Sequence, residues 1–407
     1  MKHALLKAAA LRGSRQSKRV EGRRGLIIPP AGPGSIGDAA MLTATIAALR
    51  GRGYDRVGIL QVEYGKRWDL DCDEDELLDG CRFIDYGSRA NLATVLFHMG
   101  RYTDIYCVGA DILDGIYDTD RMAYRLELLH KAAEMGLRVT ILGSSFSEKP
   151  SARCVTLIQA LPEQVRILAR DPYSHERMTC ILQRPIELCA DVAFLLEPAN
   201  GSDQALAEIE WIAAQRSGGR NIIAINANNL HEIHHPSLIS DYTALIINLA
   251  QRSCSILMIP HDSRTNRSDQ FIAHKIVASL ESTCADHVRT FQTKTPGQLK
   301  TVLGHCDLLV TGRMHAAIIA LGSHTPAMSF AYANKFEGLY LHLKLKPEEM
   351  ILTLTSLHSD ILSVSERILN VLRRSTELRA QIAKRIHFVR EAAERNFNDP
   401  VQYIAEH

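Results

Sequence analysis

The sequence predicts an α/β fold in which two Rossmann-like domains, each with a parallel, doubly wound sheet, face each other across a cleft. Short runs rich in β-branched residues alternate with longer amphipathic runs along most of the chain, and this alternation is typical of βαβ units. A cluster of Pro, Asn, Gly, Ser and Asp at 196–205 interrupts the pattern, which then restarts. The 407 residues also exceed the roughly 100 to 200 of an ordinary domain.

These features divide the chain into four segments. Residues 1–24 form a basic N-terminal segment, 25–197 a first Rossmann-like domain, and 206–372 a second one. Residues 373–407 hold a polar-faced helix that is expected to cross back over the first domain. A ligand is expected between the two domains.

The expected elements follow in chain order. In the first half the strands are GLIIPP, RVGILQV, DIYCVG, RVTILG and VRILAR, with helices through DAAMLTATIAALRGRG and RMAYRLELLHKAAEMG. In the second half the strands are NIIAINAN, SILMIPH, HVRTFQ, CDLLVTG and PAMSFAY, with helices through SLISDYTALIINLAQRS, DQFIAHKIVASLES and the segment after CDLLVTG. In such sheets functional groups lie just past the carboxyl ends of strands.

Composition excludes several functions. The net charge of +1 and the 23% share of charged residues do not indicate a nucleic-acid partner. The nine cysteines have no metal or redox spacing and fit a reducing cytoplasm. No stretch has the length of a membrane span or the apolar core of a signal peptide. Segment 1–24 is strongly basic, which predicts either contact with an anionic membrane surface or a solvated, mobile N-terminus.

The loop AGPGSIGDAA spells G-x-G-x-x-G at Gly32, Gly34 and Gly37. Pro33 removes one N–H donor, and the acid expected about twenty residues on is poorly placed. Three interpretations remain: an NAD or FAD loop, a loop that lines a substrate cleft, and simple turn geometry. Asp38 is a candidate helix cap.

The segment HEIHH, from His231 to His235, satisfies H-E-x-x-H by letter. A zinc hydrolase needs both histidines on one continuous helix. Pro236 biases His235 away from helical geometry. A polar loop on the cleft is therefore expected, and no metal site is predicted.

Three strand ends carry charged side chains. Arg313 and His315 follow CDLLVTG, and Arg170 ends VRILAR in the other domain. A guanidinium binds carboxylate or phosphate in bidentate fashion, and a histidine beside it transfers protons near neutral pH. The alternative is that each arginine pairs with a nearby acid and His315 caps or packs. Tyr332 ends the run PAMSFAY, and Lys335 follows it.

These residues together resemble the polysaccharide pyruvyl transferase family. The resemblance covers about residues 25–340 and rests on the helix start Ser35 to Asp38, on DIYCVGADILDG, ARDPYS, DVAFLL and the strand end IPH, and on DLLVTGRMHAAIIA and PAMSFAYANKFEG. It implies a GT-B-like fold with residues 25–197 on the acceptor side and 206–372 on the donor side. Such enzymes move pyruvate from phosphoenolpyruvate onto two hydroxyls of a sugar, leaving a cyclic ketal and phosphate. Phosphoenolpyruvate would be a co-substrate, with no cofactor required.

The resemblance places Arg170, Arg313 and His315 at positions that hold phosphoenolpyruvate. The reaction needs an acid/base group, and our hypothesis is that Arg313 and His315 are catalytic, with His315 as that group and the two arginines neutralising charge as phosphate leaves. The predicted substrate-binding residues are Arg170, Lys335, Tyr332, Gly37, Asp38, Asp111 and His261, of which Asp38 or Asp111 would orient the sugar hydroxyls.

The acceptor class follows from the same resemblance. A bacterial polysaccharide or its lipid-linked precursor is expected, and a lipid-linked acceptor would bring the enzyme to the inner face of the membrane. Two rival functions stay open: a glycosyltransferase with a nucleotide-sugar donor, since this architecture hosts both reactions, and a non-catalytic ligand-binding protein.

Overall fold

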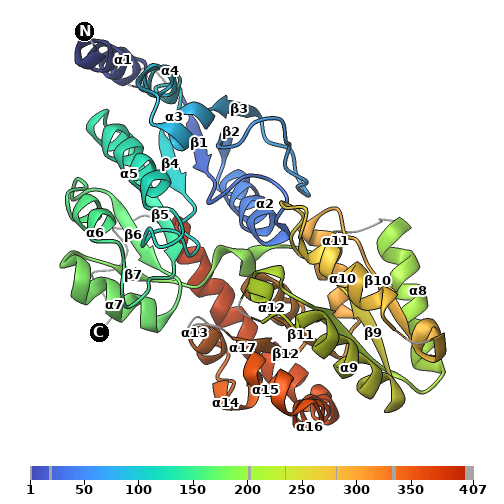
Figure 1. Ribbon diagram of the computed structural model, residues 1–407. Coiled ribbons are helices and arrows are strands. Elements are labelled where there is room, and N and C mark those ends of the chain that lie inside the picture. The colour runs from blue at the N-terminus through green and yellow to red at the C-terminus, as the bar shows by residue number, and fades with distance from the viewer. Residues whose placement is uncertain are drawn as a thin grey trace.

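The computed structural model describes residues 2–17, 21–199, 203–233, 235–280, 282–331 and 336–398. Two parallel sheets, each flanked by helices, form the two halves of the molecule (Figure 1). The predicted α/β fold with two Rossmann-like units is therefore confirmed. No disulfide bond joins cysteines within the described residues.

The first sheet has seven strands in the order β3-β2-β1-β4-β5-β6-β7. Its order reverses beside β1, so a topological switch point lies between β1 and β4. The strands are β1 (Arg23–Ile28), β2 (Tyr54–Gln61), β3 (Glu76–Asp79), β4 (Asp104–Cys107), β5 (Arg138–Ser144), β6 (Arg166–Ala169) and β7 (Glu187–Leu188).

The second sheet has six strands in the order β10-β9-β8-β11-β12-β13. This is the same 3-2-1-4-5-6 pattern, with its switch point between β8 and β11. The strands are β8 (Asn221–Asn226), β9 (Cys254–Met258), β10 (Val288–Thr290), β11 (Leu308–Thr311), β12 (Ala327–Phe330) and β13 (Ile351–Leu352).

Helices join the strands in both halves. Those around the first sheet are α2 (Ile36–Gly51), α3 (Cys81–Tyr86), α4 (Arg89–Met99), α5 (Thr119–Glu134), α6 (Ala152–Gln159), α7 (Pro172–Leu182) and the 3-10 helix η1 (Val192–Leu195). Those around the second are α8 (Asp203–Ser217), η2 (Asn229–Ile233), α9 (Leu238–Gln251), α10 (Asp269–Ala278), η3 (Ser282–His287), α11 (Pro296–Gly304), α12 (Met314–Gly322), α13 (Phe336–His342), α14 (Pro347–Met350), α15 (Leu354–Ser359) and α16 (Ile361–Arg373).

Both faces of the first sheet are buried. Along β1, Leu26 and Ile28 belong to one apolar cluster and Ile27 to the other, and none of the three is exposed to solvent. Parallel strands covered on both faces have this near-continuous apolar character. Burial at both faces therefore fixes the central strands, whose carboxyl ends carry the loops of the site.

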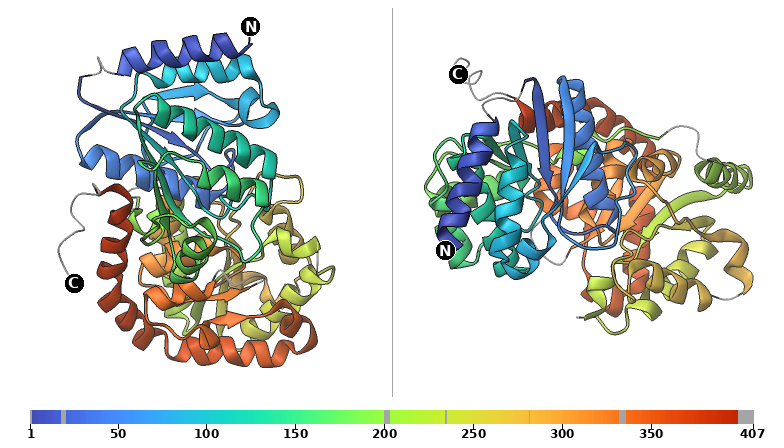
Figure 2. Two further views of the ribbon diagram at one scale, coloured as in Figure 1. Left: turned by 90° about the vertical axis from the view of Figure 1, so that its left-hand side faces the viewer. Right: turned by 90° about the horizontal axis from the view of Figure 1, so that it is seen from above.

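The last helix returns to the first half of the molecule. Helix α17 (Ser375–Glu394) continues into η4 (Arg395–Phe397) and runs beside both sheets (Figures 1 and 2). Fully buried Asn396 accepts a hydrogen bond from the Gly143 amide at 2.8 Å and donates to the Ala190 carbonyl at 3.0 Å. The crossing-back helix is thus present, and Asn396 attaches it to the end of β5.

Residues 2–17 of the basic N-terminal segment form a helix. A solvated, mobile N-terminus was one of the two expectations from the sequence. Helix α1 (Lys2–Ser17) lies along α4 (Figure 2), and its Leu6 and Ala10 pack on the outer core of the first half. Apolar contacts on one side therefore order it, and Arg12 and Arg15 stay exposed. Among the described residues, no helix combines the length and apolar character needed to cross a membrane.

Candidate functional site

A cavity of about 370 Å³ lies where the switch points of the two sheets face each other. Loops after β1 and β4 form one wall, and loops after β8, β9 and β11 form the other. It is the position that open α/β sheets offer to ligands. The predicted site residues that line it are Asp38, Asp111, Arg170, His261, Arg313 and His315. Tyr332 and Lys335 lie outside the described residues.

Arg170 and His315 meet across the boundary between the two halves. Arg170 is 3% exposed, and its Nη1 donates to Asp191 Oδ2 at 2.8 Å and lies 3.5 Å from His315 Nε2. The same Asp191 oxygen is 3.6 Å from His315 Nε2. Burial alone would raise the pKa of Asp191, but His315 and Arg170 hold it well below its ordinary value. Asp191 is therefore a buried carboxylate that orients both residues.

Arg313 is held by a bidentate ion pair in the second half. Its Nη2 is 2.8 Å from Asp269 Oδ1, its Nε donates to Asp269 Oδ2 at 3.1 Å, and its Nη1 is 3.5 Å from Asp262 Oδ2. Burial lowers the pKa of Arg313, yet the facing carboxylates raise it overall. Arg170 and Arg313 thus each pair with an acid, as the alternative interpretation of the sequence expected. Both arginines nevertheless line the cavity.

The glycine loop docks against the opposite half. The Ile36 amide donates to the His261 carbonyl at 3.0 Å, and the Ser263 amide donates to the Gly34 carbonyl at 2.8 Å. A Cβ on Gly37 would lie 2.6 Å from both Cβ and Nδ1 of His315. Gly37 therefore permits the close approach of His315, and the cavity is lined instead by Ser35 and Asp38.

Asp38 faces the cavity and does not cap its helix. Ser35 is the N-cap of α2, since its hydroxyl accepts from the Asp38 amide at 3.3 Å. The Asp38 carboxylate instead pairs with Arg264 Nη1 at 3.1 Å across the two halves. Burial raises the pKa of Asp38, although Arg264 and His315 oppose the shift. The expectation that Asp38 caps the helix is wrong, because a serine precedes it at the capping position.

His261 presents a buried imidazole to the cavity. Only 3% of it is exposed, and neither ring nitrogen has a hydrogen-bond partner among the described residues. Burial, with Arg313 nearby, holds its pKa well below the ordinary value, so the ring is neutral at pH 7. A buried polar group without a partner is costly unless a ligand or water satisfies it. His261 is therefore placed to bond a ligand oxygen.

Arg125 is a cavity residue that the sequence analysis missed. Its guanidinium is 2% exposed and donates to the carbonyls of Pro30 at 3.0 Å and Arg121 at 3.3 Å. Within the described part of the chain no carboxylate forms an ion pair with it, and burial lowers its pKa to about 10. It stays charged at pH 7. Because it lies in the middle of α5, away from any strand end, the strand-end rule could not find it.

A second cavity of about 390 Å³ adjoins the first in the N-terminal half. Asp111 lines both, and its carboxylate accepts from Tyr117 Oη at 3.1 Å. The lining of the second cavity includes the carboxylates and hydroxyl of Asp114, Glu148 and Ser145, together with the cations Lys149 and Arg177. Carboxylate and hydroxyl groups suit hydrogen bonds to a polyol.

The H-E-x-x-H segment is not a metalloprotease helix. Residues Asn229–Ile233 form a 3-10 helix, and His235 lies beyond it. His231 is buried close to Gly312, whereas His235 contacts Asp241. The two histidines therefore face different surroundings, and His234 lies outside the described residues.

Taken together, the cavity offers fixed cations, a neutral imidazole and a carboxylate-oriented histidine in one enclosed space. Such a site can bind a small polyanion, place it against a second substrate and move a proton.

Residues 36–334 match the family model described as polysaccharide pyruvyl transferase. A comparison with curated proteins finds no match.

Solved structures of the same fold include a complex of MnaA with UDP from S. aureus, with a TM-score of 0.60 at 9% identity, covering 92% of this chain and 94% of that one. A putative UDP-N-acetylglucosamine 2-epimerase from Listeria monocytogenes has a TM-score of 0.58 at 12% identity, covering 90% and 92%. A glycosyltransferase from Rickettsia africae has a TM-score of 0.53 at 8% identity, covering 93% and 100%. At these identities the likeness shows the GT-B-like fold alone.

Proposed function

The chain belongs to the polysaccharide pyruvyl transferase family, and we propose that it moves pyruvate from phosphoenolpyruvate onto two hydroxyls of a sugar in a bacterial polysaccharide or its lipid-linked precursor. The observation that carries the proposal is the meeting of Arg170 and His315, from opposite halves, on one buried carboxylate beside Arg313 and Arg125. No metal or cofactor takes part in the proposed reaction.

Donor binding would use the arginines of both walls. Phosphoenolpyruvate carries a carboxylate and a phosphate, and guanidinium groups bind both in forked geometry. Arg125 supplies a buried positive charge that forms no ion pair with a described carboxylate. Arg170 and Arg313 supply charges that Asp191 and Asp269 hold in place. A buried cation without an ion-pair partner favours an anionic ligand, because the ligand offsets the free-energy cost of burying an isolated charge.

The chemistry requires a group that moves protons. One sugar hydroxyl adds to the second carbon of the donor while its methylene carbon takes a proton and becomes methyl. The second hydroxyl then adds to the same carbon as the carbon–oxygen bond to phosphate breaks. Two hydroxyl protons leave in total: the proton taken up by the methyl group balances one, and the phosphate, released as hydrogen phosphate, takes the other. We assign this proton transfer to His315, with Asp191 stabilising its charged form and the arginines stabilising the departing phosphate.

The sugar acceptor would enter from the N-terminal half. Asp111 lies at the junction of the two cavities, and Asp38 faces the first from the same half. Both can accept hydrogen bonds from sugar hydroxyls. For a lipid-linked acceptor, the exposed basic residues of α1, such as Arg12 and Arg15, would attract an anionic membrane surface.

Ligand binding provides the first test. In calorimetric titrations the full-length protein is expected to bind phosphoenolpyruvate saturably and to bind neither UDP nor GDP. Binding of UDP or GDP without phosphoenolpyruvate would instead identify a nucleotide-sugar transferase, and binding of none of the three would favour a non-catalytic protein.

The chemical role of His315 is tested separately. His315→Gln is expected to bind phosphoenolpyruvate and to lose phosphate release with a sugar acceptor by about 10²- to 10⁴-fold, the usual contribution of an acid/base group. His274→Gln, at an exposed position of α10, is the matched control and should release phosphate like the wild type. Near-native turnover of His315→Gln would remove this residue from the chemistry.

A further inference from the structure

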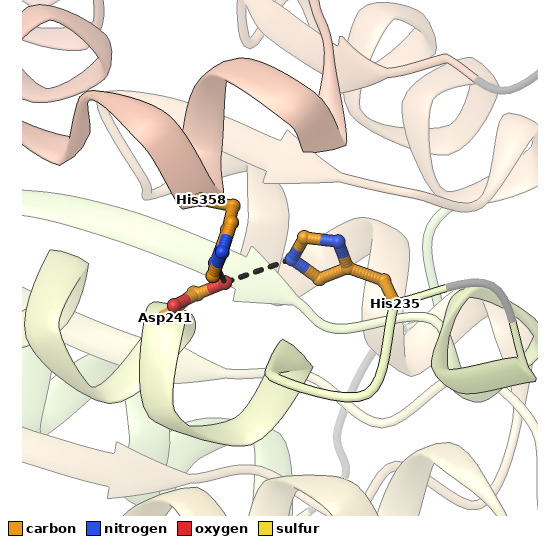
Figure 3. A group of neighbouring side chains, drawn as sticks. All are labelled: His235, Asp241 and His358. Atoms are coloured by element: carbon orange, nitrogen blue, oxygen red, sulfur yellow. Dashed lines mark hydrogen bonds and ion pairs between the residues drawn. The ribbon is translucent and has the colours of Figure 1, made fainter.

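Three side chains meet at the start of α9, outside the cavity already described. His235 precedes the helix, Asp241 lies in its first turn, and His358 comes from α15 in a distant part of the chain (Figure 3). His235 Nε2 is 2.8 Å from Asp241 Oδ2, and His358 Nδ1 is 3.0 Å from the same oxygen. Two imidazole nitrogens and one carboxylate oxygen thus lie within 4.8 Å of one another.

One carboxylate oxygen receives all of these contacts. The hydroxyl of Ser237, the residue before α9, also donates to Asp241 Oδ2, at 2.7 Å, and lies 3.0 Å from His358 Nδ1. Without a metal, both rings must carry their proton on the nitrogen that faces Asp241. A cation among the three atoms would replace those protons and leave each ring with a lone pair directed inward.

We propose that His235, Asp241 and His358 form a Zn²⁺ site. Imidazole nitrogen and carboxylate oxygen are ordinary zinc ligands, with bonds of about 2.0 to 2.2 Å. Around a tetrahedral ion such bonds place ligand atoms about 3.4 Å apart, so the two nitrogens must each move about 0.5 Å away from Asp241. His358 has the greater freedom to move, because its side chain is 63% exposed, whereas His235 and Asp241 are largely buried. The fourth position is left to Ser237 or water.

A bound zinc ion would connect one wall of the cavity to α15. The segment between β8 and α9 carries Asn228 and Leu230 in the cavity lining, and it reaches His235 five residues after Leu230. Asn229 also accepts a hydrogen bond from Arg313 Nη2 at 2.5 Å. None of the three proposed ligands lines the cavity. Zinc would therefore join this segment to α15 and stabilise the wall without taking part in the reaction.

The test is zinc binding by the full-length protein after removal of metals with a chelator. Calorimetry is expected to show one Zn²⁺ per chain, and Co²⁺ in place of zinc should give the visible absorption of a tetrahedral site. At a free Zn²⁺ concentration about a hundredfold above Kd, the ratio of folded to unfolded protein should rise about a hundredfold. Hydrogen exchange of residues 227–237 should slow in parallel. None of these readouts depends on activity.

Two variants test whether His235, Asp241 and His358 bind a metal or only form hydrogen bonds with one another. His358→Asn keeps an N–H donor near Asp241 but offers no zinc ligand, so it should fold normally in chelator and bind zinc at least about a hundredfold more weakly, since even loss of an outer contact weakens metal sites about 10- to 100-fold. His274→Asn, at an exposed position elsewhere, should bind like the wild type. If the wild type takes up no zinc, or if His358→Asn takes it up equally well, the site does not exist.

Discussion

Asp191 is the residue on which the geometry of the cavity depends. It lies 3% exposed immediately before η1, where its carboxylate also accepts from the Ala193 amide at 2.9 Å. Its other oxygen faces Arg170 from the first half and His315 from the second. The sequence motif DVAFLL contains Asp191, yet nothing local distinguishes it from an ordinary helix cap. Its role follows only from the two residues that the fold brings to it.

Gly37 gives the first prediction at this scale. Gly37→Ala places a Cβ 2.6 Å from the Cβ and Nδ1 of His315, so α2 and α12 must move apart. We expect the free energy of unfolding to fall by about 1 to 3 kcal/mol, as for other overpacked sites, and phosphate release to fall with it. Denaturant unfolding and the phosphate assay measure the two effects.

Gly51→Ala is the matched control, because Gly51 ends the same helix and a Cβ there meets nothing within 4 Å. Its stability should be unchanged or raised by up to about 1 kcal/mol. Equal behaviour of the two variants would contradict the proposed contact between Gly37 and His315.

At the scale of elements, the central strands were predictable, whereas of the four edge strands only β10, within HVRTFQ, was predicted. Strands β1, β2, β4, β5 and β8 are buried runs whose apolar residues identify them in the sequence. Strands β7 and β13 have two residues each, and β3 has only two apolar residues in ELLD. All three lie at sheet edges, where short strands are common and carry too little pattern to be recognised.

The connection of η4 to β5 gives a prediction for the C-terminal element. Asn396→Ala removes the partners of the Gly143 amide and the Ala190 carbonyl, both in buried surroundings. We expect a loss of about 2 to 6 kcal/mol in the free energy of unfolding, because each of the two buried groups left without a partner costs about 1 to 3 kcal/mol. Asn370→Ala, at an exposed position of α16, should change it by less than about 0.5 kcal/mol. Similar losses in both variants would mean that Asn396 does not hold the helix.

At the scale of the whole molecule, two equivalent sheets place their switch points face to face. The contact between Gly34 and Ser263, the pair of Asp38 and Arg264, and the Arg170–Asp191–His315 cluster all cross from one half to the other. The boundary is therefore polar and hydrogen-bonded around the cavity, while α17 runs alongside both halves (Figure 1). These polar contacts join the two halves around the cavity, beside a buried apolar cluster that also contains residues of both halves.

Buried histidines make the stability of the folded molecule sensitive to acid. Burial lowers the pKa of His231 to about 4 and that of His261 well below its ordinary value, against about 6.5 in an unfolded chain. Below pH 6.5 the unfolded state binds protons that the folded state does not, so stability falls as the pH drops towards 4 and is unaffected above 6.5.

The contribution of His231 can be measured by comparison with His231→Gln. Between about pH 6 and pH 4.5 the wild type should lose up to about 1.4 kcal/mol per pH unit more than the variant, the full effect of one differential proton. His274→Gln, with an exposed ring, should follow the wild type. Denaturant unfolding at several pH values provides the data, and parallel curves for wild type and His231→Gln would show that His231 is not held neutral.

The sequence by itself determined the two-sheet fold, the family and the strand-end residues Arg170, Arg313, His315 and His261, because alternating apolar runs and short motifs are local properties of the chain. Only the tertiary structure decided which groups meet. Asp191 reaches His315 across more than a hundred positions of sequence, Arg125 enters the cavity from the middle of a helix, and His235 finds Asp241 and His358 rather than its neighbour in H-E-x-x-H. Such contacts depend on how helices pack across the two sheets, and no local pattern of residues encodes that packing.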